Sequence, residues 1–173
     1  MVAPIDMSGV VGLDGTDNGV RSEPDGYVML RLGGARYAVG MSAVAEVGRL
    51  PRLTRVPGTP MWLAGVANWR GRILAVLDVR PLLDAAITPT GSLGRLVVLT
   101  ENTVTVGLLT EGVQGVVNCS AERIDPPPMT LDSETGSLLI GQFTESSGPV
   151  AVLDPVSVLN LRLRLPSPRR AAG

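Results

Sequence analysis

The chain has 173 residues and a formal net charge of −1 at pH 7, with 45% hydrophobic but only 3% aromatic side chains. This length allows one domain with a substantial core, or two small lobes that share one, and the core must be aliphatic. The near-neutral charge, with no basic cluster beyond Arg169 and Arg170, argues against a nucleic-acid partner. The few scattered aromatic residues also argue against a base-stacking platform.

Two side-chain types that often carry catalysis are missing. The chain has no histidine, and arginine supplies all 15 basic residues. These absences exclude a Ser-His-Asp triad, an imidazole metal site, a P-loop lysine and a Schiff-base lysine. The single Cys119 excludes an internal disulfide and a multi-cysteine metal site, and we expect it to be a small buried hydrophobe.

Carboxylate pairs could still act as acid and base, and Asp132 with Glu134 is the nearest such pair in the sequence. They stand in a segment rich in Ser, Thr and Gly, which favours a solvated loop. We therefore predict a non-enzymatic protein with no catalytic residue, no cofactor and no metal.

No segment contains 18 or more unbroken apolar residues, so we expect no transmembrane helix and no direct membrane insertion. The N-terminus lacks a basic region followed by an apolar run, which argues against a signal peptide. These features predict a cytoplasmic protein.

The N-terminal part of the chain combines a polar segment with the first strands. Residues 1–26 are rich in Gly, Asp and Ser, and we expect them to be disordered. Residues 27–32 and 36–40 predict a hairpin around Gly33-Gly34. In a strand over 42–48, Val44 and Glu46 share one face, which suits either a contact surface or a half-exposed strand with Glu46 in water.

The segment 56–80 follows a proline-rich loop and predicts extended chain, a turn and a buried strand. Pro57 and Pro60 end any earlier element, and the apolar residues 63–67 precede the polar turn Asn68-Trp69-Arg70-Gly71. Residues 73–77 then read as a buried strand ending at Asp78. The spacing alone favours a hairpin in a small barrel, with Arg70, Arg72 and Asp78 solvated at its ends.

The second half of the chain predicts two more hairpins and a short helix. Strands are expected over 93–100, 103–110, 111–118, 138–144 and 149–153. Asp154 suits a helix N-cap and Pro155 the first helical position, so a short amphipathic helix follows, and 166–173 is a tail. About nine short strands in all are typical of a β-barrel or a sandwich.

The segment 56–80 resembles the signature of the CheW-like family, the adaptor modules of bacterial chemosensory arrays. The order and spacing match without a gap, and the resemblance extends over about residues 27–165. The matching features are Val56-Pro57, Ala64-Gly65-Val66, Asn68-Trp69-Arg70-Gly71, the apolar strand 73–77 and Asp78-Val79-Arg80.

The resemblance implies an all-β fold of two small SH3-like five-stranded barrels, packed together through an apolar seam, with a short C-terminal helix. We expect the first barrel to take residues 27–70 plus 154–165. We expect the second barrel to take residues 71–153.

The resemblance also implies a function. Family members couple chemoreceptors to a CheA-type histidine kinase, for flagellar chemotaxis or a related output such as pilus-based motility. The groove between the barrels receives the cytoplasmic tip of the receptor, and opposite barrel faces pair with the kinase regulatory domain. Such a protein works in the cytoplasm at membrane-associated receptor arrays; the alternative is a CheW-like scaffold with partners outside a kinase array.

The resemblance implies a protein-interaction site in which Glu46 and Arg70 form a charged pair that orients the partner. Asn68 and Gly65 can equally serve turn geometry, and Trp62 can either form an apolar patch in the groove or fill core. Trp69 is the better interface candidate, because Trp and Arg are enriched at binding hot spots. The positions that match those of the family are Val44, Glu46, Gly65, Asn68 and Arg70. Trp62 and Trp69, which depart from the smaller or aliphatic residues expected at their places, complete the expected interaction site.

Overall fold

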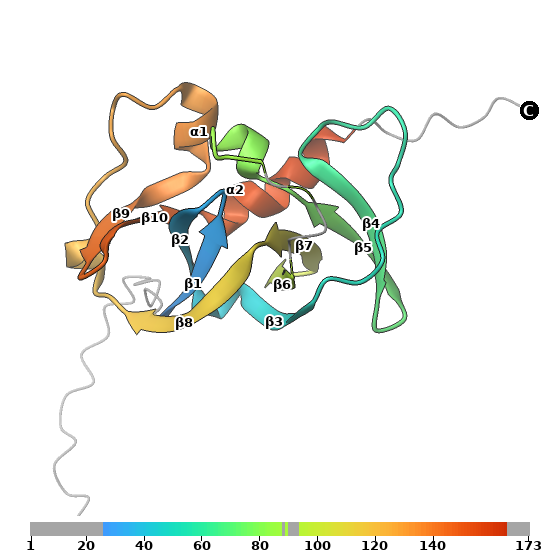
Figure 1. Ribbon diagram of the computed structural model, residues 1–173, viewed down its shortest axis with the longest axis horizontal. Helices are drawn as coiled ribbons and strands as arrows, with labels where there is room; N and C mark the ends of the chain where they lie inside the picture. Colours follow the sequence, from blue (N-terminus) through green and yellow to red (C-terminus); the bar gives the residue numbers. More distant parts are fainter. Residues whose placement is uncertain (1–25, 88, 90–93, 166–173) are drawn as a thin grey trace, which may run out of the picture.

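The structure, a computed structural model, describes residues 26–87, 89 and 94–165. These residues form ten strands in two five-stranded sheets, together with short helical segments (Figure 1). The all-β prediction with two five-stranded units and a short C-terminal helix is confirmed. The expected disordered segment 1–26, apart from Gly26 in the first strand, and the expected tail 166–173 lie outside the described residues.

The first barrel is built from two separate parts of the chain. Its strand order is β8-β1-β2-β10-β9, with a parallel contact between β2 and β10. It occupies the left side of Figure 1. Its strands are β1 (Gly26–Leu32), β2 (Ala35–Gly40), β8 (Gly112–Asn118), β9 (Leu139–Glu145) and β10 (Gly148–Leu153).

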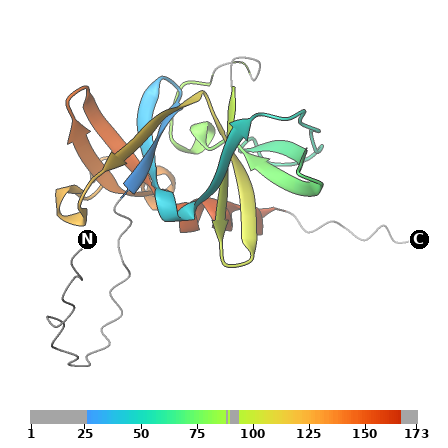
Figure 2. The same ribbon diagram turned by 90° about the horizontal axis from the view of Figure 1, so that it is seen from below.

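The second barrel is continuous in sequence and lies between β2 and β8 of the first. Its strand order is β3-β6-β7-β5-β4, with a parallel contact between β5 and β7. Figure 2, seen from below, shows the two barrels side by side. Its strands are β3 (Val44–Arg49), β4 (Leu63–Trp69), β5 (Arg72–Leu77), β6 (Arg95–Glu101) and β7 (Val104–Thr110).

This strand membership corrects the expected division of the barrels. Residues 44–69 belong to the second barrel rather than the first, and residues 112–153 belong to the first rather than the second. The parallel contacts explain the difference, because each barrel closes by pairing strands that are distant in sequence. A split at the turn after Trp69 would separate β4 from β5, its antiparallel partner.

The two barrels repeat one topology in circularly permuted order, with β3-β4-β5-β6-β7 matching β8-β9-β10-β1-β2. The registers agree residue by residue. In β4 a bulge lies between Leu63 and Gly65, which pair with Leu77 and Val76 of β5. In β9 a bulge at the same place lies between Leu139 and Gly141, which pair with Leu153 and Val152 of β10. The tetrapeptide Ala-Val-Leu-Asp occurs at 75–78 and again at 151–154, at equivalent places.

Three apolar clusters follow the same symmetry. The largest is the seam between the barrels and contains residues such as Leu30, Leu99 and Leu153. The interior of the first barrel holds Tyr27 and Phe143, whose rings lie 6.1 Å apart. A third cluster, composed mainly of smaller aliphatic residues, fills the second barrel. The core is mainly aliphatic, as the composition predicts.

Helical segments from each barrel pack against the other barrel or bond to it. Helix α2 (Pro155–Asn160) leaves the first barrel and packs on β6 and β7 of the second, while Asp154 caps it by accepting a hydrogen bond from Val156 N at 3.1 Å. Conversely, the segment after β5 carries Leu82, whose carbonyl accepts a 2.9 Å bond from Thr135 of the first barrel. The described residues also include α1 (Ser133–Ser137), η1 (Met41–Ala43), η2 (Arg80–Leu82), η4 (Ala121–Arg123) and η5 (Leu161–Arg164).

The predicted solvated loop around Asp132 and Glu134 contains α1, which the pattern does not reveal because it is only five residues long. Asp132 is its N-cap and accepts a 2.8 Å bond from Thr135 N, which lowers the pKa of that carboxyl. This carboxylate therefore stabilises a helix start. Cys119 is buried beside Val117, as expected.

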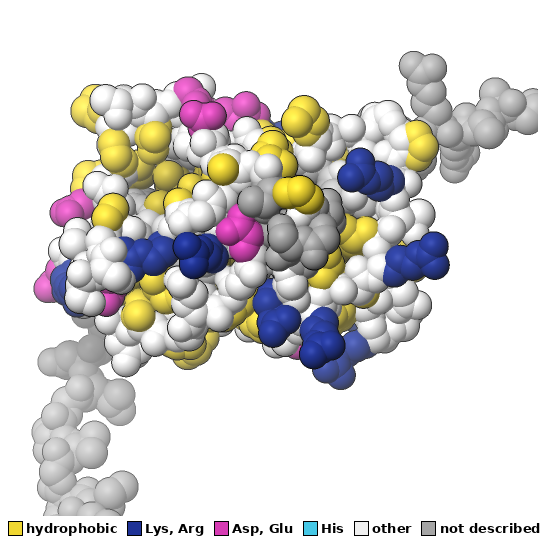
Figure 3. All heavy atoms as spheres, in the orientation of Figure 1, with side chains coloured by type: hydrophobic (Ala, Val, Ile, Leu, Met, Phe, Trp, Pro, Cys, Tyr) yellow, Lys and Arg dark blue, Asp and Glu magenta, His cyan; other side chains and the backbone are white. Residues whose placement is uncertain are grey.

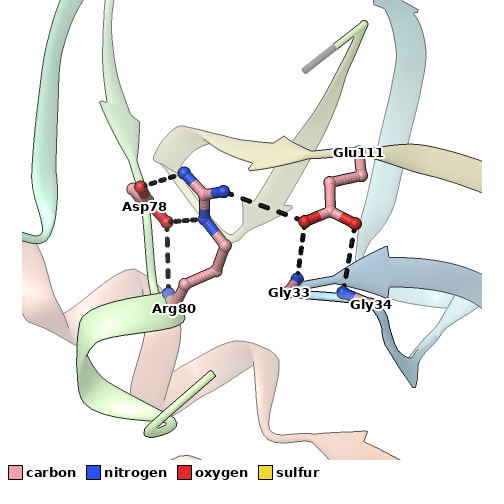
Figure 4. Close-up of polar contacts among 5 residues, drawn as sticks. All are labelled: Gly33, Gly34, Asp78, Arg80 and Glu111. Atoms are coloured by element: carbon pink, nitrogen blue, oxygen red, sulfur yellow. Dashed lines mark hydrogen bonds and ion pairs between the residues drawn. The ribbon is translucent and has the colours of Figure 1, made fainter. Parts of the chain in front are cut away.

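A buried ionic cluster joins the barrels (Figure 4). Arg80 is 1% exposed, and its Nε and Nη2 atoms donate to both oxygens of Asp78 at 2.8 and 2.7 Å. Its Nη1 atom lies 3.8 Å from Glu111, whose oxygens accept the amides of Gly33 and Gly34 at 2.8 and 3.2 Å. The interpretation of Asp78 as a solvated strand end is therefore wrong, because Asp78 is 8% exposed and pairs with the buried Arg80.

Candidate protein-interaction site

The candidate site begins at the β4–β5 turn. Trp69 pairs with Arg72, and the two residues between them have φ angles of 51° (Arg70) and 79° (Gly71). Positive φ at both central residues defines a type I′ turn, which matches the twist of the flanking strands. Asn68 supports the turn, because its Oδ1 accepts the amide of Gly71 at 2.9 Å. The turn projects the Arg70 side chain outward, and 75% of it is exposed.

Glu46, on the edge strand β3, accepts hydrogen bonds from Trp69 and Arg70 at the tip of the β4–β5 hairpin. Its Oε2 accepts the indole Nε1–H of Trp69 at 3.1 Å. Its Oε1 accepts Nε of Arg70 at 2.9 Å and also Nη2 of the same guanidinium. The structure thus brings together Glu46, Trp69 and Arg70, with Asn68 behind them.

These contacts shift both titrations toward the charged forms. The hydrogen bond from Arg70 lowers the pKa of the Glu46 carboxyl, and the indole N–H acts in the same direction. The carboxylate in turn raises the pKa of Arg70. Because the pair is open to water, its main effect is to orient the guanidinium rather than to stabilise the fold.

An open groove of about 410 Å³ lies beside this triad. Arg70 and Arg72 border it on the hairpin side, and Thr103 and Thr105 border it from the β6–β7 hairpin. Ile73, also part of the lining, is 74% exposed. Charged donors, hydroxyls and one exposed aliphatic side chain together suit a surface that binds another protein.

The charges around this groove are mostly positive. Residues 44–110 contain seven arginines and four acidic side chains, and two of those arginines are paired within the barrel. On the face shown in Figure 3, basic side chains predominate over the second barrel at the right, whereas both signs are mixed at the left. This barrel is therefore complementary to an acidic surface.

Three expected site residues lie elsewhere. Trp62 is 7% exposed and packs in the seam between the barrels, so it fills core. Val44 is half-buried against the same seam. Gly65 has φ +149°, and a Cβ there would lie 2.5 Å from the carbonyl oxygen of Thr54, so its position demands glycine.

Sequence reasoning missed Gly48, which lies under the Trp69 ring. A Cβ at Gly48 would lie 2.4 Å from Cη2 of that indole. A glycine inside a strand pattern signals close approach, and that signal is present at this position. Glu111 was also missed, because nothing local marks it as the partner of a distant arginine.

A second hollow, of about 660 Å³, lies between the 50–61 loop and the segment after β5. Met61 and Ile87 in its lining are 76% and 57% exposed. Within the described residues, no group of three or more acidic or cysteine side chains could hold a metal ion. The described helices are all too short or too polar to cross a bilayer.

The relatives of this chain point to one family. Protein PilI of Pseudomonas aeruginosa is 34% identical over 56% of this chain and 56% of PilI, so the chain spans little more than half of that relative. The chemotaxis protein CheW of Klebsiella aerogenes is 29% identical over 67% of this chain and 73% of its own. Protein FrzA of Myxococcus xanthus is 30% identical over 84% and 88%.

A solved structure shows the same fold. The scaffolding protein TtCheW from Thermoanaerobacter tengcongensis superposes with a TM-score of 0.67 over 76% of this chain and 89% of its own, at 22% identity. The likeness supports the assignment of two small SH3-like barrels. A family model described as the CheW-like domain matches residues 26–162. The chain therefore belongs to the CheW-like family.

Proposed function

We propose that this protein is a non-enzymatic adaptor that couples chemoreceptors to a CheA-type histidine kinase in a chemosensory array. The array serves chemotaxis or a related pathway such as pilus-based motility. Membership of the CheW-like family supports this role, and relatives named for chemotaxis lie among the matches. The adaptor acts in the cytoplasm, beside receptors that are themselves in the membrane.

The observation that carries the proposal is the preformed tip of the second barrel. Glu46 holds Arg70 through two nitrogens, and the rest of the exposed guanidinium faces outward. Such an edge can bind a carboxylate or a backbone carbonyl of a partner. Arg72 and Ile73 extend the same surface along β5.

The partner surface that fits this tip has an acidic group beside an apolar side chain. The regulatory domain of the kinase is the proposed occupant, and the receptor tip binds elsewhere on the adaptor. An exposed arginine contributes to orientation and association rate, while the neighbouring apolar contact with Ile73 contributes affinity.

The test is a calorimetric titration with the regulatory domain of the CheA-type kinase from the same organism. Arg70→Ala and Glu46→Arg are expected to weaken binding while each variant keeps the wild-type melting temperature. Ser146→Ala, at the equivalent turn position of the first barrel, is the matched control and should bind normally. Absence of binding by a folded wild-type protein would rule out kinase coupling and leave a scaffold with other partners.

A further inference from the structure

The indole of Trp69 packs directly on Gly48 of β3, a contact we call the Gly48 seat. Its six-membered ring lies over Gly48, where any Cβ would overlap Cη2 at 2.4 Å and approach Cζ2 at 3.2 Å. The ring also packs against the aliphatic cluster inside the second barrel. Trp69 is thus partly buried and folded back onto β3, which differs from an anchor that projects into solvent.

The seated ring aims its N–H at one particular oxygen. Nε1 donates to Oε2 of Glu46, and the guanidinium of Arg70 takes Oε1. Each carboxylate oxygen therefore has a different donor. Two donors on opposite oxygens restrict rotation of the carboxylate, and this in turn fixes the direction in which Arg70 points.

From this arrangement we infer that Trp69 is a positioning residue, seated on Gly48, that holds the Glu46 carboxylate so that Arg70 presents its free donor edge to an acidic partner. The inference rests on the proposed function for the identity of that partner. The contact between the indole and Glu46 is a property of the free protein.

The first barrel shows that the fold itself does not require this arrangement. The registers place Val117 at the position of Gly48 and Glu145 at the position of Trp69. Gly115 stands where the second barrel has Glu46. A barrel of the same topology therefore forms without the seat, the indole or the carboxylate.

The structural part of the inference is tested by nuclear magnetic resonance on the free protein. The chain has two tryptophans, so the indole N–H resonance that disappears in Trp69→Phe belongs to Trp69. That resonance is expected to shift when acid protonates Glu46, and to lose this titration in Glu46→Gln. If the chemical shift of this N–H responds neither to acid nor to Glu46→Gln, the inference is overturned, whether or not the protein binds a partner.

The functional part is tested by binding kinetics with the kinase regulatory domain. Trp69→Phe keeps an aromatic ring over Gly48 but removes the N–H, and we expect affinity to fall about three- to tenfold, the effect of one hydrogen bond. Gly48→Ala displaces the ring and should weaken binding at least as much. Glu145→Gln, at the matching position of the first barrel, is the control.

The outcomes separate the inference from the proposed function. Wild-type affinity in Trp69→Phe would overturn the positioning role, as would a loss fully explained by a lower melting temperature. If the wild-type protein itself does not bind, the proposed function fails, and the resonance of Trp69 still decides whether the indole holds Glu46.

Discussion

The two barrels share one topology and one register, yet among the residues that the structure describes only the second has the indole–carboxylate–guanidinium contact at its hairpin tip. Positions at which the barrels agree are those that the fold requires. Gly65 and Gly141 are an example, since each approaches a backbone carbonyl of the loop that bridges its strand. Positions at which they differ are free to serve a partner.

The aspartate after the last strand of each barrel shows how one position can acquire two roles. Asp154 caps α2, whereas Asp78 binds the buried Arg80. Both stabilise the segment that crosses to the opposite barrel. The two barrels therefore share a structural framework, and the second adds a local surface to it.

The largest effect is expected for Arg80→Met. The variant leaves Asp78 and Glu111 without their common cation in a mostly buried site, so unfolding free energy should fall by about 3–5 kcal/mol. Denaturant unfolding measures this change. Arg72→Met, on the surface of the same barrel, is the control and should stay within about 0.5 kcal/mol of wild type. Equal effects of the two substitutions would show that the cluster does not hold the barrels together.

The matched glycines are expected to behave alike. In Gly65→Ala and Gly141→Ala the new Cβ meets a carbonyl oxygen at 2.5 and 2.2 Å, so each should cost about 1–3 kcal/mol in thermal or denaturant unfolding. Gly112→Ala, where no atom lies within 4 Å, is the control. If only Gly65→Ala destabilised the protein, the equivalence of the two barrels would be in doubt.

A smaller effect is expected for the helix cap. Asp154→Ala removes the acceptor for Val156 N and should cost about 1 kcal/mol, whereas Asp154→Asn keeps an acceptor and should cost less. Asp78→Asn should cost more than Asp154→Asn, because the buried Arg80 loses its charge partner. Unfolding curves of the three variants give this order, and a reversed order would contradict the assigned roles.

Substitution of Thr110 is expected to leave stability unchanged or to raise it, unlike the substitutions above. Its hydroxyl is fully buried and has no hydrogen-bond partner among the described residues. Thr110→Val removes an unsatisfied polar atom at nearly constant volume, so the melting temperature should stay constant or rise. A clear fall would indicate that the hydroxyl has a partner in solution, and Thr105→Val, at an exposed position, is the comparison.

The smallest effect is expected when pH is lowered and the affinity for the kinase domain is measured. Because Arg70 lowers the pKa of Glu46 below its ordinary 4.5, the carboxylate stays charged as pH falls toward that value. The pair is complete above the ordinary pKa and is lost as pH falls through the lowered one. Affinity for the kinase domain should therefore be flat between neutral pH and about 5, and Glu46→Gln should lack any step below that range. A step in wild-type affinity near pH 6 would point to a different titrating group.

Local sequence was sufficient for the elements but not for their assembly. The turn at Arg70-Gly71, the strand before Asp78 and the cap at Asp154 follow from short-range chemistry, and the structure has all three. The predicted turn began two residues too early, since Asn68 and Trp69 lie in β4, and Ile73 of the predicted buried strand is 74% exposed. The barrel membership does not follow, because it depends on parallel contacts between strands far apart in the chain.

The same limit applies to the site. Glu46 and Arg70 could be paired through a family resemblance, but the seat at Gly48 depends on how far the Trp69 ring folds back. The contact of Arg80 with Glu111, which in turn accepts the amides of Gly33 and Gly34, joins segments far apart in the chain, so a local pattern cannot indicate it.

Amide hydrogen exchange with and without the kinase regulatory domain shows whether the tip of the second barrel is the partner surface. We expect new protection in β3 and in the β4–β5 hairpin, residues 46–49 and 68–73. The equivalent segments of the first barrel, 115–118 and 144–149, should exchange as they do in the free protein. Protection confined to those first-barrel segments would show that the tip of the second barrel is not the partner surface.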